Sequence, residues 1–364
     1  MTLLEKYAHL LVHYCLELKA DERLYINTTL LGEPLAREVY RAGLRVGAHV
    51  FTEFTMREQH TIFMANASED ELRRVPPFYE QAMETFEAYL FIRAPYNLRE
   101  GGGTDEHRNN LRNETMRDMQ KTYFRRTATR ELKRNLCQYP TDAAAQEAGM
   151  GLEEYTQFVY NACKLFADDP IAAWLEVRAK QQHVTDYLNN CKTVRYVAQG
   201  TDITFSTEGR KWINSDGQTN MPSGEVYTSP VEDAVNGVVH FTLPCLYQGH
   251  EVVGVTLWVK DGYIERWEAQ QGQEFLDYIF TIPGTRRFGE AAIGTNYDIN
   301  RMTKNILFDE KIGGTIHMAI GQSYLQTGGK NESAVHCDMI TDMTKGGYIE
   351  ADGIKIYENG VFII

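Results

Sequence analysis

The stretch RLYINTTLLGEPLAREVYRAGLRVGAHVFTEFT, residues 23–55, predicts a strand, a helix and a second strand in that order. RLYINTT at 23–29 and HVFTEFT at 49–55 are short runs rich in β-branched and aromatic residues, which is typical of strands. The helix is expected to begin around Glu33 and to run to about Ala42. A strand–helix–strand order indicates a parallel sheet flanked by helices.

The same alternation extends on both sides of this stretch. An amphipathic helix is expected over residues 3–19, helical sequence over 68–87 and a long charged helix over 105–126. AYLFIRAP at 88–95 predicts a buried strand, and a further apolar segment ends at LCQYP, residues 136–140. Residues 141–188 are helical in pattern throughout and are expected to form a bridge between two domains. The sequence therefore predicts an α/β N-terminal domain over residues 1–190.

The sequence pattern changes from helical to strand-and-turn at about residue 192. Strand-and-turn segments follow one another to the C-terminus, and Asp-Gly and Asn-Gly pairs mark several of them as hairpins. With 364 residues, the chain is longer than one hydrophobic core usually supports. We therefore expect a second, strand-rich α+β domain over residues 191–364, and this domain is the predicted catalytic one.

Charge and cysteine content narrow the classes of protein. Asp and Glu total 50 against 37 Lys and Arg, a net charge of −13, which disfavours nucleic acids and anionic membranes as partners. The sequence contains no run of 18 apolar residues and no secretory leader, so neither a membrane span nor export is expected. The six cysteines are scattered without a CxxC pair, which favours free thiols in a reducing cytoplasm.

Acidic residues and histidines in glycine-rich, strand-to-turn contexts form four clusters after residue 220. In NMPSGEVYTSP, residues 220–230, Glu225 opens an apolar strand after a turn. In RRFGEAAIGTN, residues 286–296, Glu290 lies in a small, apolar run, where a carboxylate is rarely buried unless it is paired or binds a metal.

The two remaining clusters add histidines. LFDEKIGGTIHMAIGQSY, residues 307–324, contains Asp309, Glu310, His317 and Tyr324. A lone histidine between apolar residues, such as His317, is more often a core residue, but the neighbouring glycines and Tyr324 favour a pocket. In GGKNESAVHCDM, residues 328–339, His336 and Asp338 are two residues apart, so on a strand they would face the same side.

Together the clusters supply four carboxylates and two imidazoles, a set that suits two divalent first-row ions. The six candidate ligands are Glu225, Glu290, Glu310, His317, His336 and Asp338. Carboxylates can bridge two ions, and four of them balance the charge of two divalent cations. Such a pair of ions can hold a bridging hydroxide and polarise a carbonyl, which is hydrolytic chemistry.

The same four clusters resemble the M29 family of metallopeptidases, the thermophilic aminopeptidase group. The resemblance is carried by NMPSGEVYT at 220–228, GEAAIGTN at 289–296, LFDEKIGGTIH at 307–317 and NESAVHCDM at 331–339. The opening LVHYCLELKADERLYIN, residues 11–27, also resembles the start of the family, so the similarity extends over nearly the whole chain.

This resemblance implies a homodimeric aminopeptidase activated by Zn, Co, Mn or Mg, which acts on peptides with a free N-terminus. Carried over by motif, Glu225, Glu310, His317, His336 and Asp338 would be metal ligands. Glu290 would bridge both ions, and Tyr324 would stabilise the tetrahedral intermediate. The spacing from Glu310 to His317 is longer than in some relatives, so Asp309 remains the alternative to Glu310 as a ligand.

Two other functions stay open on the residues alone. Another two-metal amide hydrolase would use the same ligand chemistry. A non-catalytic α/β binding protein with a degenerate site would lack some ligands, whereas all six motif positions are filled here. The expected function is a metal-dependent aminopeptidase with a two-metal site and a metal-bound hydroxide.

Overall fold

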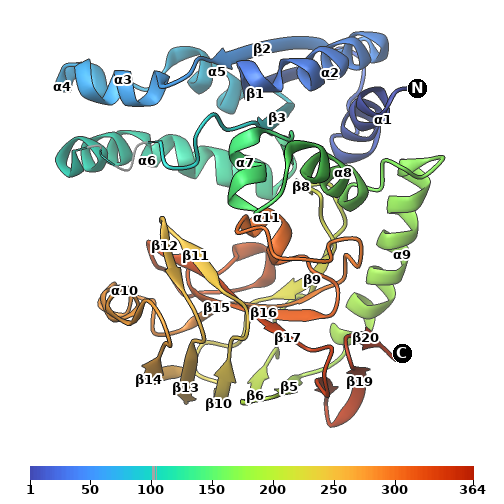
Figure 1. The fold of residues 1–364 in the computed structure, drawn as a ribbon, viewed down its shortest axis with the longest axis vertical. Coiled ribbons are helices and arrows are strands. Elements are labelled where there is room, and N and C mark those ends of the chain that lie inside the picture. The colour runs from blue at the N-terminus through green and yellow to red at the C-terminus, as the bar shows by residue number, and fades with distance from the viewer. Residues whose placement is uncertain (101–102, 104) are drawn as a thin grey trace. The chain divides into compact units, whose positions relative to one another are not determined.

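A computed structural model describes residues 1–100, 103 and 105–364 of the chain. The chain forms two compact units, which Figure 1 shows as a ribbon. Unit 1 comprises Met1–Ile171 and Gly217–Pro222, and unit 2 comprises Ala172–Asp216 and Ser223–Ile364. The division of function between an N-terminal domain and a catalytic domain at about residue 190 stays a prediction.

Unit 1 is built on a five-stranded parallel sheet with the strand order β2-β1-β3-β4-β8. Its strands are β1 (Arg23–Thr29), β2 (His49–Thr55), β3 (Ala88–Arg93), β4 (Lys133–Gln138) and β8 (Asn220–Met221). The first four strands come from the four segments in which the sequence predicts strands or apolar runs. Parallel neighbours require long crossover connections, and helices form them here.

The helical segments of unit 1 connect these strands. They are α1 (Leu3–Leu10), the π-helical η1 (Leu11–Cys15), the 3₁₀ segment η2 (Leu30–Gly32), α2 (Glu33–Val46), α3 (Gln59–Asn66), α4 (Glu69–Leu72), α5 (Pro77–Thr85), α6 (Glu106–Ala128), α7 (Asp142–Glu147) and α8 (Leu152–Ala162). The helical sequence expected over 68–87 is divided into α4 and α5, because Pro76 and Pro77 disfavour a helical conformation in the residues before them. Helix α9 (Pro170–Leu188) contributes all but its first two residues to unit 2.

Unit 2 is strand-rich and antiparallel. Its eight-stranded sheet has the order β14-β13-β10-β6-β5-β18-β19-β20, its five-stranded sheet has the order β17-β16-β15-β9-β7, and β11 pairs with β12. The strands are β5 (Thr193–Ala198), β6 (Thr201–Ser206), β7 (Ile213–Ser215), β9 (Glu225–Thr228), β10 (Val235–His240), β11 (Cys245–Tyr247), β12 (His250–Val252), β13 (Thr256–Lys260), β14 (Tyr263–Glu268), β15 (Phe288–Gly294), β16 (Thr315–Gly321), β17 (His336–Asp342), β18 (Tyr348–Ala351), β19 (Ile354–Glu358) and β20 (Val361–Phe362). Short helical segments complete it: α10 (Gln273–Ile279), α11 (Ile306–Asp309) and the 3₁₀ segment η3 (Leu325–Thr327).

Three of the Asp-Gly and Asn-Gly pairs join antiparallel strands in hairpins, as the sequence predicts. Asp261 and Gly262 join β13 to β14, and both have a positive φ, as the tight two-residue turn of a hairpin requires. Asp352 and Gly353 join β18 to β19 in the same way. The predicted fold class, a parallel α/β region followed by a strand-rich α+β region, is confirmed. No helix in the described part of the chain is both long and apolar enough to cross a membrane.

The two faces of the five-stranded sheet have different roles. Side chains alternate between the faces of a strand, and the apolar side chains of one face belong to the hydrophobic core of unit 2. Examples are Ile293 on β15, Ile316 and Met318 on β16, and Met339 on β17. The opposite face carries the candidate functional residues, although strands β15 and β16 are buried along their whole length.

Candidate metal centre

Five of the six predicted ligands lie on one face of the five-stranded sheet. They are Glu225 on β9, Glu290 on β15, His317 on β16, and His336 and Asp338 on β17. The strand register places them together, because cross-strand partners share a face: Glu290 is opposite Ala319, which is itself opposite Asp338. A register irregularity in β15 between Phe288 and Glu290 accompanies the turn of the Glu290 side chain into the cluster.

Small residues separate the ligands on this face. Ala292 is the partner of His317, Gly294 is the partner of Glu225, and Gly321 is the partner of His336. A Cβ at Gly294 would lie 2.2 Å from the carbonyl oxygen of Ile312, so this position accepts only glycine. The alternation of a functional residue with alanine or glycine keeps space open between the carboxylates and imidazoles.

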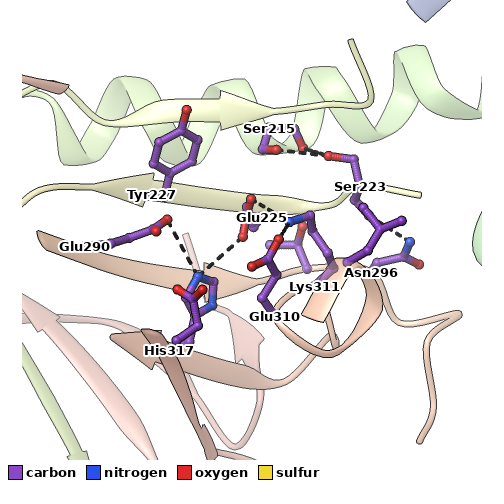
Figure 2. Close-up of polar contacts among 12 residues, drawn as sticks. Ser215, Ser223, Glu225, Tyr227, Glu290, Asn296, Glu310, Lys311 and His317 are labelled. Carbon is purple, nitrogen blue, oxygen red and sulfur yellow. Dashed lines mark hydrogen bonds and ion pairs between the residues drawn. The ribbon is translucent and has the colours of Figure 1, made fainter. Parts of the chain in front are cut away.

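The polar atoms of the cluster are close to one another. His336 Nε2 lies 3.1 Å from Glu290 Oε2 and 3.4 Å from Asp338 Oδ1. His317 Nε2 lies 3.5 Å from Glu225 Oε2 and 3.7 Å from Glu290 Oε1. Figure 2 draws both contacts as dashed lines. These contacts connect all five strand-borne residues into one centre.

Three overlapping groups in this centre have the composition of a metal site. They are Glu225, Glu290 and His317; Glu290, His336 and Asp338; and Glu310, His317 and Asp338, and within each group the potential ligand atoms lie within 4.8 Å of one another. Glu290, His317 and Asp338 each belong to two groups. The arrangement therefore suits more than one ion, with residues shared between neighbouring positions.

Buried polar atoms without hydrogen bonds test whether the residues fit metal ions. Glu225 Oε2, Asp338 Oδ1 and both ring nitrogens of His317 are buried and make no hydrogen bond to any residue that the structure describes. Burying polar atoms of this kind without a partner costs free energy, so native proteins rarely leave several of them in one place. Divalent cations would satisfy carboxylate oxygens and imidazole nitrogens, so the donor set fits them.

The structure separates the two neighbouring acidic residues Asp309 and Glu310. Glu310 follows helix α11 and belongs to the cluster with His317 and Asp338. The Asp309 carboxylate instead accepts hydrogen bonds from the backbone N–H of Thr303, at 2.8 Å, and from its hydroxyl, at 2.9 Å. Asp309 therefore closes a local turn, and Glu310 is the residue of this pair that faces the candidate centre.

Lys311 is a part of the centre that the sequence analysis does not identify. Its side chain is 0% exposed, its Nζ lies 2.9 Å from Glu225 Oε1, and it also donates to Glu310 Oε1. Figure 2 shows the ammonium between the two carboxylates. A lysine in the run DEK is expected to be exposed, because lysine is rarely buried unless it is paired.

Two tyrosines border the cluster. The Tyr324 hydroxyl lies 3.3 Å from His336 Nε2. The Tyr227 ring packs edge-on against the Tyr324 ring, with centroids 5.4 Å apart. Tyr227 is two residues after Glu225 on β9 and so shares its face, a relationship that the period of a strand could have revealed.

A backbone contact fixes the orientation of one histidine. His336 Nδ1 lies 2.7 Å from the carbonyl oxygen of Gln322, so this nitrogen carries the proton and donates it. The other nitrogen, Nε2, then faces Glu290 and Asp338. Contacts of this kind between a ligating histidine and a carbonyl are common around metal sites, because they fix the tautomer and the ring plane.

Burial and mutual charge shift the pKa values in the centre. Burial raises the pKa of Glu310 to about 8, against the opposing effect of Lys311. Burial alone would lower the pKa of His317, but the carboxylates of Glu290, Glu225 and Asp338 raise it to about 9. Burial alone would raise the pKa of Asp338, but His336 and other cationic neighbours lower it to about 2. The carboxylates thus attract positive charge, which divalent ions can supply in place of the protons on the histidines.

Comparison with known proteins identifies the family of the chain. The family of thermophilic metalloproteases (M29) matches residues 1–362. Aminopeptidase 2 of Geobacillus stearothermophilus is 29% identical, over 93% of this chain and 91% of its own length. Aminopeptidase T of Thermus thermophilus is 26% identical, over 98% and 95%. The solved structure of wild-type AmpT from Thermus thermophilus has the same fold, with a TM-score of 0.86 at 22% identity over 100% of this chain and 99% of that chain. The chain therefore belongs to the M29 family of thermophilic metalloproteases.

Proposed function

We propose that this protein is a metal-dependent aminopeptidase that hydrolyses the N-terminal peptide bond of peptides through two divalent ions. The observation that carries the proposal is the cluster of four carboxylates and two imidazoles, in which Glu225 Oε2, Asp338 Oδ1 and both ring nitrogens of His317 are buried without a hydrogen bond to any described residue. The names of the relatives, Aminopeptidase 2 and Aminopeptidase T, support peptides with a free N-terminus as the substrate class. Residues 191–364 would form the catalytic domain.

The proposed ligands are the six residues that the sequence analysis identifies. They are Glu225, Glu290, Glu310, His317, His336 and Asp338. Glu290 belongs to two of the three groups and contacts both histidines, which supports a bridging role. When bound, a pair of Zn, Co, Mn or Mg ions lowers the pKa of coordinated water and polarises the carbonyl group of the scissile bond.

Tyr324 would act on the substrate as a hydrogen-bond donor. Burial, together with the charges of Glu290 and Asp338, raises its pKa well above the usual value, so the hydroxyl keeps its proton. A protonated hydroxyl at the edge of the cluster can donate to the oxygen that gains negative charge in the tetrahedral intermediate. Its contact with His336 and the packing of Tyr227 hold the ring in place for this role.

Two further properties rest on the sequence and the family resemblance. We propose a homodimer and a cytoplasmic location. Size-exclusion chromatography with light scattering would test the first, and a stable monomer at micromolar concentration would contradict it.

The experiment that tests the proposed function is metal removal and reconstitution. The purified protein would be treated with chelator, reloaded separately with Co, Zn, Mn and Mg, and assayed on a panel of aminoacyl-p-nitroanilides. We expect activity to disappear on chelation and to return with metal. An N-acetylated version of the best substrate is the control, and it should not be cleaved because it lacks a free amino group.

Two results would favour the alternative functions. Bound metal without cleavage of any aminoacyl substrate would contradict the aminopeptidase and leave another two-metal amide hydrolase, to be tested with other amides. A protein that binds no metal and cleaves none of the substrates would instead fit a non-catalytic binding protein.

A further inference from the structure

Lys311 divides the candidate centre into two unequal parts. Its ammonium group contacts Glu225 and Glu310, and each of these carboxylates uses one of its oxygens in that contact. Glu225 Oε2 is left on the other side, 3.5 Å from His317 Nε2 and without a hydrogen bond to any described residue. Lys311 therefore fixes the direction in which both carboxylates present their second oxygen (Figure 2).

The three potential ligand groups differ in their contact with this ammonium. The group of Glu225, Glu290 and His317 contains one carboxylate bound to Lys311, and so does the group of Glu310, His317 and Asp338. In the third group, Glu290, His336 and Asp338, both carboxylates face His336, and neither forms an ion pair with Lys311. A cation in the third group would therefore bind carboxylates that form no ion pair with Lys311.

Electrostatics therefore distinguishes an ion bound by Glu290, His336 and Asp338 from an ion bound beside Glu225 and Glu310. A divalent ion bound by Glu225 or Glu310 would share a carboxylate with a buried ammonium, and like charges at such short range in a poorly solvated site repel strongly. Four carboxylates balance two divalent ions, and the ammonium adds one positive charge on the side of Glu225 and Glu310. The second ion therefore enters a position at which part of the negative charge is already compensated.

We propose that Lys311 is a positioning residue that makes the ion held by Glu290, His336 and Asp338 tight and the ion beside Glu225 and Glu310 weak and exchangeable. This inference rests on the proposed two-ion function. It predicts a protein that keeps one ion through dilution or dialysis and needs added metal to fill the second position.

Titration of the chelated protein with Co²⁺ tests the inference without an activity assay. Calorimetry and the visible absorption of bound Co²⁺ would give the stoichiometry and the two dissociation constants. We expect two constants that differ by at least about tenfold in the native chain. In Lys311→Met, the weaker constant should fall by at least about tenfold while the tighter one changes by less than about threefold. Lys311→Arg keeps the positive charge and should keep the two constants apart.

Lys192→Met is the matched control, because Lys192 forms an ion pair with Glu208 on the surface of the same unit. It should leave both constants unchanged. If Lys311→Met does not fold, as judged by circular dichroism, Lys311→Gln and the native chain remain to be measured.

The outcomes separate this inference from the proposed function. Two ions of equal affinity in the native chain, or an unchanged difference in a folded Lys311→Met or Lys311→Gln protein, would overturn the role of Lys311 and leave the two-ion centre in place. Loss of the second ion in those variants would also overturn it, because the lysine would then support that position. A single ion in every protein would overturn the two-ion function and this inference together.

Discussion

The Tyr324 hydroxyl lies 3.3 Å from Nε2 of His336, and the same nitrogen faces Glu290 and Asp338. Tyr324 comes from the loop after β16, and its backbone carbonyl accepts a hydrogen bond from the hydroxyl of Thr327 at 2.6 Å. The loop therefore holds the phenol at the border of the centre, beside the proposed ligand His336.

Replacement of Tyr324 by Phe removes one hydrogen-bond donor and keeps the ring. We expect turnover on an aminoacyl-p-nitroanilide to fall by about 10²–10³, the usual loss for one donor to a developing oxyanion. Metal content should stay the same, because the tyrosine contributes no proposed ligand atom. Metal analysis and steady-state kinetics on the same preparation check both expectations.

Tyr278→Phe is the control for this change, since Tyr278 is an exposed tyrosine on α10. It should retain near-native turnover. Near-native turnover in Tyr324→Phe as well would exclude the phenol from the reaction.

Glu290 is the residue through which the two histidines are connected, because its two oxygens face His317 and His336 separately. Glu290→Gln preserves the shape and removes the charge. We expect metal content to fall below two ions per chain and turnover to fall by more than the roughly 10–100-fold that is typical of groups outside the ligand sphere. Inductively coupled plasma mass spectrometry gives the ion count, and two ions at full occupancy would contradict a bridging role. Glu265→Gln, at an exposed position on β14, is the control and should change neither quantity.

Much of the fold could be predicted from local sequence patterns. The strands β1, β2 and β3 come from the runs that the sequence predicts, and the hairpin at Asp261 and Gly262 comes from a turn whose chemistry needs a positive φ. The two adjacent prolines could also have indicated that the helical region 68–87 is divided, although we did not predict this division. The sequence did not allow a prediction that residues 217–222 join the parallel sheet. Strand β8 has only two residues and pairs with a strand about 80 positions earlier.

The candidate site was predictable to the extent that it depends on strand periodicity. His336 and Asp338 share a face because they are two residues apart on β17. Lys311 was not predictable, because its burial depends on Glu225, which is distant in sequence and approaches only in the folded unit. The different contacts of Asp309 and Glu310 were not predictable either, since the two acidic residues are adjacent in sequence.

A matched pair of substitutions tests the choice between Asp309 and Glu310. Glu310→Gln should weaken metal binding, because it removes one charged member of the group that includes His317 and Asp338. Asp309→Asn should keep metal binding, because the Asp309 carboxylate accepts hydrogen bonds from Thr303 and an amide oxygen can still accept them. Its expected effect is a loss of about 1 kcal/mol in the free energy of unfolding, the usual net value of a hydrogen bond. Metal titration and urea denaturation of the two variants check these expectations, and loss of metal from Asp309→Asn alone would reverse the assignment.

The pH dependence of metal affinity follows from the protons that the centre holds. The carboxylates around His317 raise its pKa to about 9, so at pH 6–8 the imidazole is protonated and an ion that binds it must displace that proton. Proton competition of this kind weakens metal binding as the pH falls. For one displaced proton, the dissociation constant should therefore decrease by about tenfold for each unit by which the pH rises from 6 to 8. Calorimetric titration with Zn²⁺ in buffers of different ionisation enthalpy measures the proton release directly. His250→Gln, at an exposed histidine on β12, should keep the slope, whereas His317→Gln should reduce it along with the affinity. A dissociation constant that does not change over this range would mean that the ion displaces no proton from His317, and the raised pKa of this histidine would then be contradicted.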